Sequence, residues 1–259
     1  EIVNDNMRSA GLKAILTKRK DDLYGILNGI DTRVWHPEKD KHIIKKYTIK
    51  NIEDKLPNKE ALAAKFGFKF DENIPIVGII ARLYDEKGLD IISEAFPEIM
   101  KLNLQMVLLG TGDRKYQSLF EKMSQKHKDK FACYLGFNDE LAHLIEAGAD
   151  IFLMPSRYEP CGLNQMYSLT YGTVPVVRET GGLADTVIPF NEKSGEGNGF
   201  LFKKYDADSM LKELKKALKF FDDKKTWNKI IRNGMKVDFS WNASAKKYID
   251  LYKTILNSN

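Results

Sequence analysis

From residue 74 onwards, short apolar runs rich in β-branched residues alternate with segments whose apolar residues have helical spacing. The runs are residues 74–83, 104–110, 131–137, 150–156 and 174–179, and the helical segments between them are residues 88–102, 115–128, 138–149 and 161–172. Short, continuously apolar runs are typical of parallel strands that are buried on both faces, and their alternation with helices indicates βαβ units. We therefore predict an α/β fold, a Rossmann-like parallel sheet flanked by helices.

The segments outside this alternation are mostly helical in pattern. We expect helices at residues 7–20 and 58–67, a strand or loop at residues 24–37, and three closing helices at residues 206–223, 225–236 and 240–256. The change of pattern predicts an entry segment at residues 1–72 and a Rossmann-like domain with C-terminal helices at residues 73–259.

Composition excludes several classes of protein. A hydrophobic fraction of 43% is ample for a core. The net charge is +5, but positive and negative residues are interspersed along the chain, which favours a solvated surface over a nucleic-acid interface. Cys133 and Cys161 lie far apart in the sequence and match no zinc-ligand spacing, which argues against a disulfide framework and against a zinc site. No apolar run approaches the ~18 residues of a membrane span, so we expect no membrane partner.

Glycines, charged residues and one threonine follow these apolar runs. They would lie at the carboxyl ends of the strands, where ligands bind in open parallel sheets. They are Arg82, Lys87, Gly88, Gly110, Gly112, Arg157, Glu159, Gly162, Thr180, Gly181 and Gly182. Taken singly, each is as well explained as a surface charge, a turn glycine or a loop carboxylate. Together, two cations, glycine-rich helix starts and one carboxylate suit a diphosphate that carries a polar sugar.

Residues 155–187, PSRYEPCGLNQMYSLTYGTVPVVRETGGLADTV, closely resemble the starch and glycogen synthases of glycosyltransferase family five. The segments GILNGIDTRVWHPEKD, ARLYDEKGLD and DFSWNASAKKYIDLY agree as well, so the resemblance covers nearly the whole chain. It implies the C-terminal domain of a GT-B glycosyltransferase. Related GT-B transferases carry a second glutamate eight residues after the first, whereas this chain has Tyr167 there, as the glucan synthases do. Glu86 and Asn164 depart from the family's usual residues.

The resemblance implies a role for individual residues. Arg82 and Lys87 would clamp the diphosphate of ADP-glucose without a metal or other cofactor, and Glu159 would face the transferred glucose. Further substrate contacts would come from Asn28, Gly110, Phe137, Cys161, Gly162, Leu163, Thr180, Gly181 and Gly182. Among these, the amides at 161–163 would hold the sugar, residues 180–182 would cradle the distal phosphate, and Asn28 would lie at the interdomain cleft. Phe137 would stack under the adenine, although a core position is an equal alternative.

The implied activity is retaining transfer of glucose from ADP-glucose to an α-1,4-glucan acceptor. The family's N-terminal domain, with its K-x-G-G-L loop, has no counterpart in this sequence. We therefore expect a C-terminal half that needs that domain as a partner and is inactive alone. A bacterial cytoplasm is the expected location, or a plastid if the source is a plant or alga. Another GT-B hexosyltransferase and a non-catalytic nucleotide-sugar-binding module remain as alternatives.

Overall fold

The computed structural model describes residues 11–257, and these divide into two compact units. Residues 30–240 form the larger unit. The smaller unit comprises the described residues before Ile30 and after Ser240. It contains α1 (Lys13–Lys18), the 3-10 turn Lys20–Asp22 and α10 (Trp241–Asn257). Part of the helix predicted at residues 7–20 lies outside the described residues. The proposed boundary at residue 72 stays a prediction.

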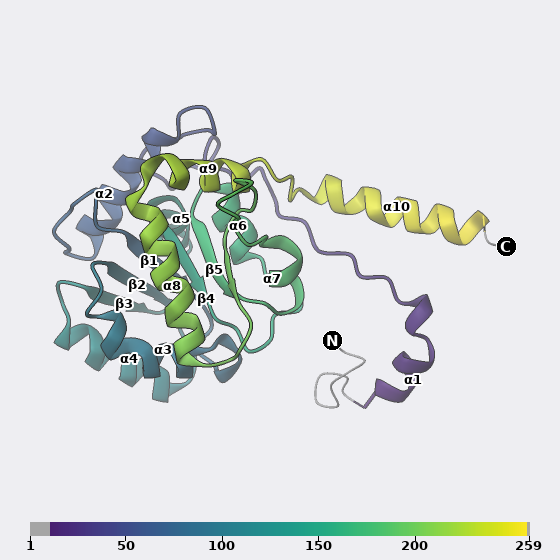
Figure 1. The fold of residues 1–259 in the computed structure, drawn as a ribbon, viewed down its shortest axis with the longest axis horizontal. Helices are drawn as coiled ribbons and strands as arrows, with labels where there is room; N and C mark the ends of the chain where they lie inside the picture. The colour runs from purple at the N-terminus through teal and green to yellow at the C-terminus, as the bar shows by residue number, and fades with distance from the viewer. Residues whose placement is uncertain (1–10, 258–259) are drawn as a thin grey trace. The chain divides into compact units, whose positions relative to one another are not determined.

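A six-stranded parallel sheet forms the centre of the larger unit, in the order β3-β2-β1-β4-β5-β6 (Figure 1). Its strands are β1 (Ile76–Ile80), β2 (Gln105–Gly110), β3 (Phe131–Leu135), β4 (Ile151–Met154), β5 (Val174–Arg178) and β6 (Phe200–Phe202). Every pairing is parallel. The predicted α/β fold with a Rossmann-like sheet is confirmed.

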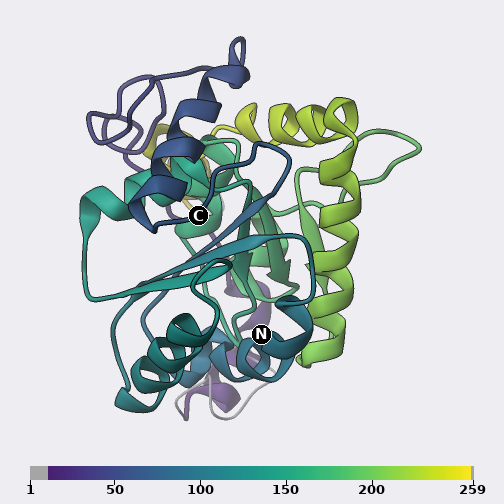
Figure 2. The same ribbon diagram turned by 90° about the vertical axis from the view of Figure 1, so that its left-hand side faces the viewer.

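Helices cover both faces of this sheet (Figures 1 and 2). They are α2 (Leu56–Lys65), α3 (Leu89–Ile99), α4 (Arg114–Lys126), α5 (Asp139–Gly148), α6 (Asn164–Thr170), α7 (Gly181–Thr186), α8 (Ala207–Asp222) and α9 (Lys224–Met235). Side chains alternate across each strand, so Val77 and Ile79 join the core under α3, α4 and α8, whereas Ile76 packs with α2 and α5. The side chains of Asn138, Asp206 and Asp223 cap the starts of α5, α8 and α9.

The strand order reverses between β1 and β4, which are neighbours in the sheet. After β1 the chain moves outward through β2 and β3, and it then returns to place β4 on the other side of β1. The two connections that leave the carboxyl ends of β1 and β4 therefore run in opposite directions and open a crevice between them. In sheets of this kind ligands bind in that crevice.

Candidate functional site

The crevice between β1 and β4 contains two adjoining hollows. One, of about 190 Å³, is lined by Arg82, Lys87, Ser156 and Asn164 together with strand residues. The other, of about 410 Å³, is lined by Arg82, Tyr84, Glu86, Lys87, Tyr158, Glu159 and Pro160. The structure thus brings the three predicted catalytic residues, Arg82, Lys87 and Glu159, to one edge of the sheet.

Lys87 reaches this edge because the turn that carries it packs against the loop after β4. The turn is a short 3-10 helix (Asp85–Lys87) that ends at Gly88, whose φ is +74°. A Cβ atom at Gly88 would lie 2.1 Å from the carbonyl oxygen of Pro155, so only glycine allows this approach. The amide of Arg157 also donates to the carbonyl of Glu86, at 2.8 Å. These contacts fix Lys87 beside the loop of Glu159.

Glu159 is almost fully buried, and one of its carboxylate oxygens accepts two side-chain donors. Lys87 Nζ lies 2.5 Å from Glu159 Oε2, and the hydroxyl of Ser156 donates to the same oxygen at 3.2 Å. One of the two predicted clamp cations, Lys87, therefore forms an ion pair with the predicted sugar-facing carboxylate. An incoming phosphate would compete with Glu159 for the ammonium group of Lys87.

The loop of Glu159 is also packed against the start of α7. The amide of Gly182 donates to the carbonyl oxygen of Glu159 at 3.0 Å, and a Cβ atom at Gly182 would lie only 1.9 Å from the carbonyl oxygen of Cys161. The structure thus brings Thr180, Gly181 and Gly182 beside Glu159. The same amide also donates to the carbonyl of Pro160 at 3.2 Å, so it would contribute to a phosphate cradle only after leaving both carbonyls.

Two residues that sequence reasoning missed hold the 156–162 loop in place. The side-chain amide of Gln165 donates to the carbonyls of Cys161 and Gly162, at 2.9 and 3.1 Å. Arg178, the last residue of β5, donates to the carbonyl of Ser156 at 2.8 Å and to that of Arg157. Ser156, Gln165 and Arg178 all lie within the quoted motif, but only the fold shows what they contact.

The remaining predicted residues lie at other positions. Gly110 ends β2 and accepts a hydrogen bond from the amide of Gly136. Phe137 follows β3 and is 86% exposed, which rules out the alternative of a core position and leaves its ring open to a ligand. Leu163 directly precedes α6 and is partly exposed. Asn28 belongs to the smaller unit, so its role at a cleft stays a prediction.

Tyr167, at the position of the second glutamate in related transferases, is held in an aromatic stack. The ring of Trp35 lies between those of Tyr167 and His143, with centroid distances of 4.0 and 3.7 Å. Burial, with the nearby charge of Glu146, raises the pKa of Tyr167 to about 12. Tyr167 is a neutral packing residue here, and it lines neither hollow of the crevice.

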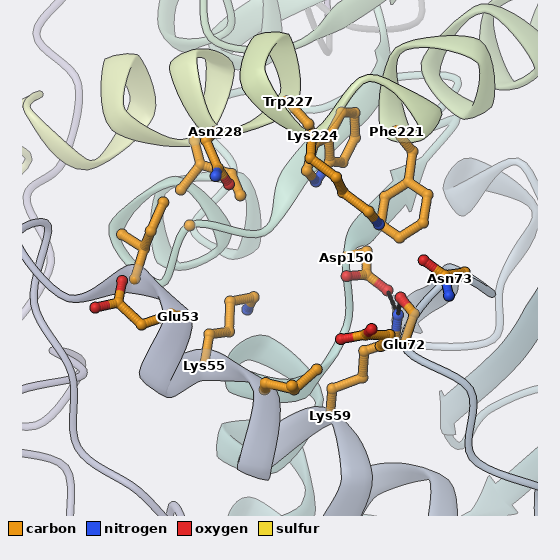
Figure 3. A pocket seen from close by; sticks show the side chains of 14 residues that line it. Glu53, Lys55, Lys59, Glu72, Asn73, Asp150, Phe221, Lys224, Trp227 and Asn228 are labelled. Atoms are coloured by element: carbon orange, nitrogen blue, oxygen red, sulfur yellow. Dashed lines mark hydrogen bonds and ion pairs between the residues drawn. The ribbon is translucent and has the colours of Figure 1, made fainter.

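A separate hollow of about 430 Å³ lies at the amino end of β4, beside Asp150 (Figure 3). Its cations are largely occupied by protein groups: Lys59 pairs with Asp150 at 2.9 Å, and Lys55 donates to the carbonyl of Ala147 and the hydroxyl of Thr173. Burial lowers the pKa of Lys55 to about 7. This hollow contains none of the residues predicted from the sequence.

Two further properties concern the described residues, 11–257. Among them, one group has ligand atoms close enough to share a metal ion, namely His42, Asp139 and His143, and none of these lines the crevice. Within the same residues, no helix is both long and apolar enough to span a membrane.

Residues 60–237 match the family described as "Glycosyl transferases group 1". The chain is 49% identical over 247 residues to a glycogen synthase from Thermosipho africanus, covering 95% of this chain and 51% of the relative. A glycogen synthase from Clostridium novyi is 46% identical over 247 residues, with coverage of 95% and 52%. The chain thus spans about half the length of the curated relatives it matches, corresponding to their C-terminal half.

Among solved structures, the catalytic domain of Starch Synthase IV from Arabidopsis thaliana, bound to ADP and acarbose, superposes with a TM-score of 0.90. The two sequences are 34% identical, and the match covers 97% of this chain and 53% of the plant protein. This agreement extends the sequence similarity to the arrangement of the whole sheet and its helices.

Proposed function

Because the chain belongs to the group 1 glycosyl transferases and is a homologue of the C-terminal half of glycogen synthases, we propose that it is the donor-binding half of a glucan synthase. The intact enzyme would transfer glucose from ADP-glucose to the non-reducing end of an α-1,4-glucan, with retention of configuration. The N-terminal domain of the same protein would supply the other wall of the cleft. The bacterial relatives favour a bacterial cytoplasm over a plastid as its location.

The observation that carries this proposal is the convergence of Arg82, Lys87 and Glu159 on the crevice between β1 and β4. Two cations at a topological switch point suit the diphosphate of a nucleotide sugar. They would stabilise the negative charge that develops on the diphosphate as the glycosidic bond breaks, the charge stabilisation that commonly contributes most to catalysis. Arg82 and Lys87 would supply this positive charge, so we propose no metal or other cofactor for the transfer.

ADP-glucose is proposed as the donor, and a glucan as the acceptor, on the strength of the plant relative, whose structure is described as bound to ADP and acarbose. Glu159 would be freed from Lys87 when the diphosphate binds, and its carboxylate could then accept hydrogen bonds from the sugar. The exposed ring of Phe137 offers a surface for the adenine. A different hexosyltransferase is disfavoured because Tyr167 is packed where such enzymes have a second carboxylate.

Isothermal titration calorimetry with ADP, ADP-glucose, UDP-glucose and GDP-mannose tests this proposal. We expect ADP and ADP-glucose to bind the purified chain, and Arg82→Ala and Lys87→Ala each to weaken ADP binding at least about tenfold, because each removes a charge-assisted contact. Lys122→Ala, at an exposed lysine of α4, is the matched control and should bind as wild type. Preference for UDP-glucose or GDP-mannose would support another hexosyltransferase, and unchanged affinity in both variants would reject the clamp.

A further inference from the structure

His143, on α5, is a fully buried histidine whose Nδ1 atom is held by a hydrogen bond to a carboxylate. Its Nδ1 lies 2.7 Å from Asp40 Oδ2, and the same oxygen accepts the hydroxyl of Tyr171 at 2.5 Å. A carboxylate can only accept, so the proton of this bond belongs to Nδ1. In the neutral ring, Nε2 then carries a lone pair.

None of residues 11–257 provides a hydrogen-bond partner for that second nitrogen, although it is completely buried. Asp139 lies one turn earlier on the same helix, and its Oδ2 is 4.0 Å from His143 Nε2. His42 approaches from another segment, with its ring centroid 4.9 Å from that of His143. The three residues therefore bring a carboxylate and two imidazoles together, and one ligand atom from each lies within 4.8 Å of the others.

The arrangement also has the outer support that metal-binding histidines usually have. Asp40 orients the ring of His143 through Nδ1, and its other oxygen accepts the backbone amide of His42 at 2.8 Å. A carboxylate behind a ligating histidine fixes the tautomer and the direction of the free lone pair. The ring of Trp35 stacks on His143 at 3.7 Å and keeps it from rotating.

A cation shared by Nε2 of His143 and the carboxylate of Asp139 would satisfy both acceptors at once. Ligand atoms on one zinc ion, at bond lengths of about 2.0–2.2 Å, lie about 3.3 Å apart in tetrahedral geometry. The present separations, which reach at most 4.8 Å, would have to shorten by up to about 1.5 Å. Asp139 has room to move because its side chain is 58% exposed. Glu140, whose carboxylate is 3.9 Å from His42 Nδ1, adds negative charge nearby.

We propose that His42, Asp139 and His143 form a binding site for a divalent transition-metal ion, with zinc as the reference ion and a water molecule in the fourth position. Imidazole and carboxylate ligands suit zinc and its first-row neighbours. The ion would tie the segment that carries His42 to α5. The site lies outside the crevice of the proposed glucosyl transfer and does not depend on that function.

Calorimetric titration of the metal-free chain with zinc chloride tests the proposal. One zinc ion should bind per chain, and the Tm should rise with zinc concentration because the ion binds only the folded state. The double variant His42→Gln, Asp139→Asn should lose at least about tenfold in zinc affinity while keeping its metal-free Tm. His127→Gln and Cys161→Ser, which alter other potential zinc ligands, are the controls and should bind zinc as wild type.

A nitrogen NMR spectrum separates a metal from a proton at the same place. If the proposal is correct, the Nε2 signal of His143 is that of an unprotonated nitrogen and shifts when zinc is added. An imidazolium signal that zinc does not change would overturn the proposal, because a proton would then provide the positive charge. Absence of zinc binding, or equal zinc affinity in the double variant, would overturn it as well.

Discussion

At the scale of single residues, the ion pair between Lys87 and Glu159 links the proposed donor clamp to the proposed sugar-facing carboxylate. In the intact enzyme, Arg82→Ala or Lys87→Ala should lower turnover at least about hundredfold, because removing one preorganised charge typically costs about 3–4 kcal/mol of transition-state stabilisation. Steady-state kinetics measures the effect, and circular dichroism checks that the fold survives. Near-normal turnover in both variants would contradict the clamp.

A second prediction at this scale concerns Glu146, a buried carboxyl that accepts the hydroxyl of Ser168 at 2.6 Å. Burial raises its pKa from 4.5 to about 8. Between these values the folded protein holds a proton that the unfolded chain has released, so this group's contribution to stability falls as the pH rises. The buried Lys55 changes the pH dependence of the unfolding free energy chiefly above its own pKa of about 7. The effect of Glu146 is therefore best measured between pH 5 and 7.

Glu146→Gln removes this titration. Relative to wild type, the variant should therefore gain stability as the pH rises from 5 to 7, by up to about 1.4 kcal/mol per pH unit. Urea unfolding at several pH values measures the difference. Glu94→Gln, at an exposed carboxylate of α3, is the control and should show a flat difference. A flat profile for Glu146→Gln would mean that this carboxyl titrates normally.

At the scale of elements, the turn at Gly88 determines where Lys87 lies. Gly88→Ala would place a side chain in the left-handed region and against the carbonyl of Pro155. Gly67→Ala is a matched control, because its φ of +71° is similar but a Cβ atom there would meet nothing within 4 Å. The control should cost about 1–2 kcal/mol in unfolding free energy from backbone strain alone.

Gly88→Ala should cost at least about 1 kcal/mol more than the control, since the backbone must move to relieve the contact. It should also weaken ADP binding, whereas Gly67→Ala should not. Chemical denaturation and calorimetry measure the two effects. Equal costs, with ADP affinity unchanged in both variants, would show that the turn does not position Lys87.

Much of the fold could be predicted from local patterns, and the failures have physical causes. The runs that became β1 to β5 are long enough to show apolar continuity, whereas β6, Phe200–Phe202, has only three residues and follows a glycine-rich loop. Residues 24–37 contain no named helix or strand, and Ile30 pairs with Ser240 through an isolated bridge. Such a long-range pairing leaves no periodic signal.

The candidate site could be predicted only in part for the same reason. Arg82, Lys87 and Glu159 follow strands, so sheet topology alone places them at one edge. The support from Arg178 and Gln165 depends on which carbonyls the folded loop presents, and the sequence does not show this. The His42, Asp139 and His143 group was also missed, because its members come from two segments that are close only in the fold.

At the scale of the whole molecule, the chain spans about half the length of its curated relatives. A cleft enzyme needs both walls, so we predict that the purified chain binds ADP but does not extend glycogen from ADP-glucose. Incorporation of radiolabelled glucose into glycogen measures this, with a complete glycogen synthase as the positive control. Robust incorporation by the chain alone would show that this half is sufficient for transfer.

A crystal structure of the chain with ADP tests the proposed donor site most directly. We expect the diphosphate in the crevice between β1 and β4, within hydrogen-bonding distance of Arg82 and Lys87, with Lys87 Nζ moved away from Glu159. ADP bound instead in the hollow beside Lys55 and Asp150, or anywhere outside the crevice, would rule out this donor site (Figure 3).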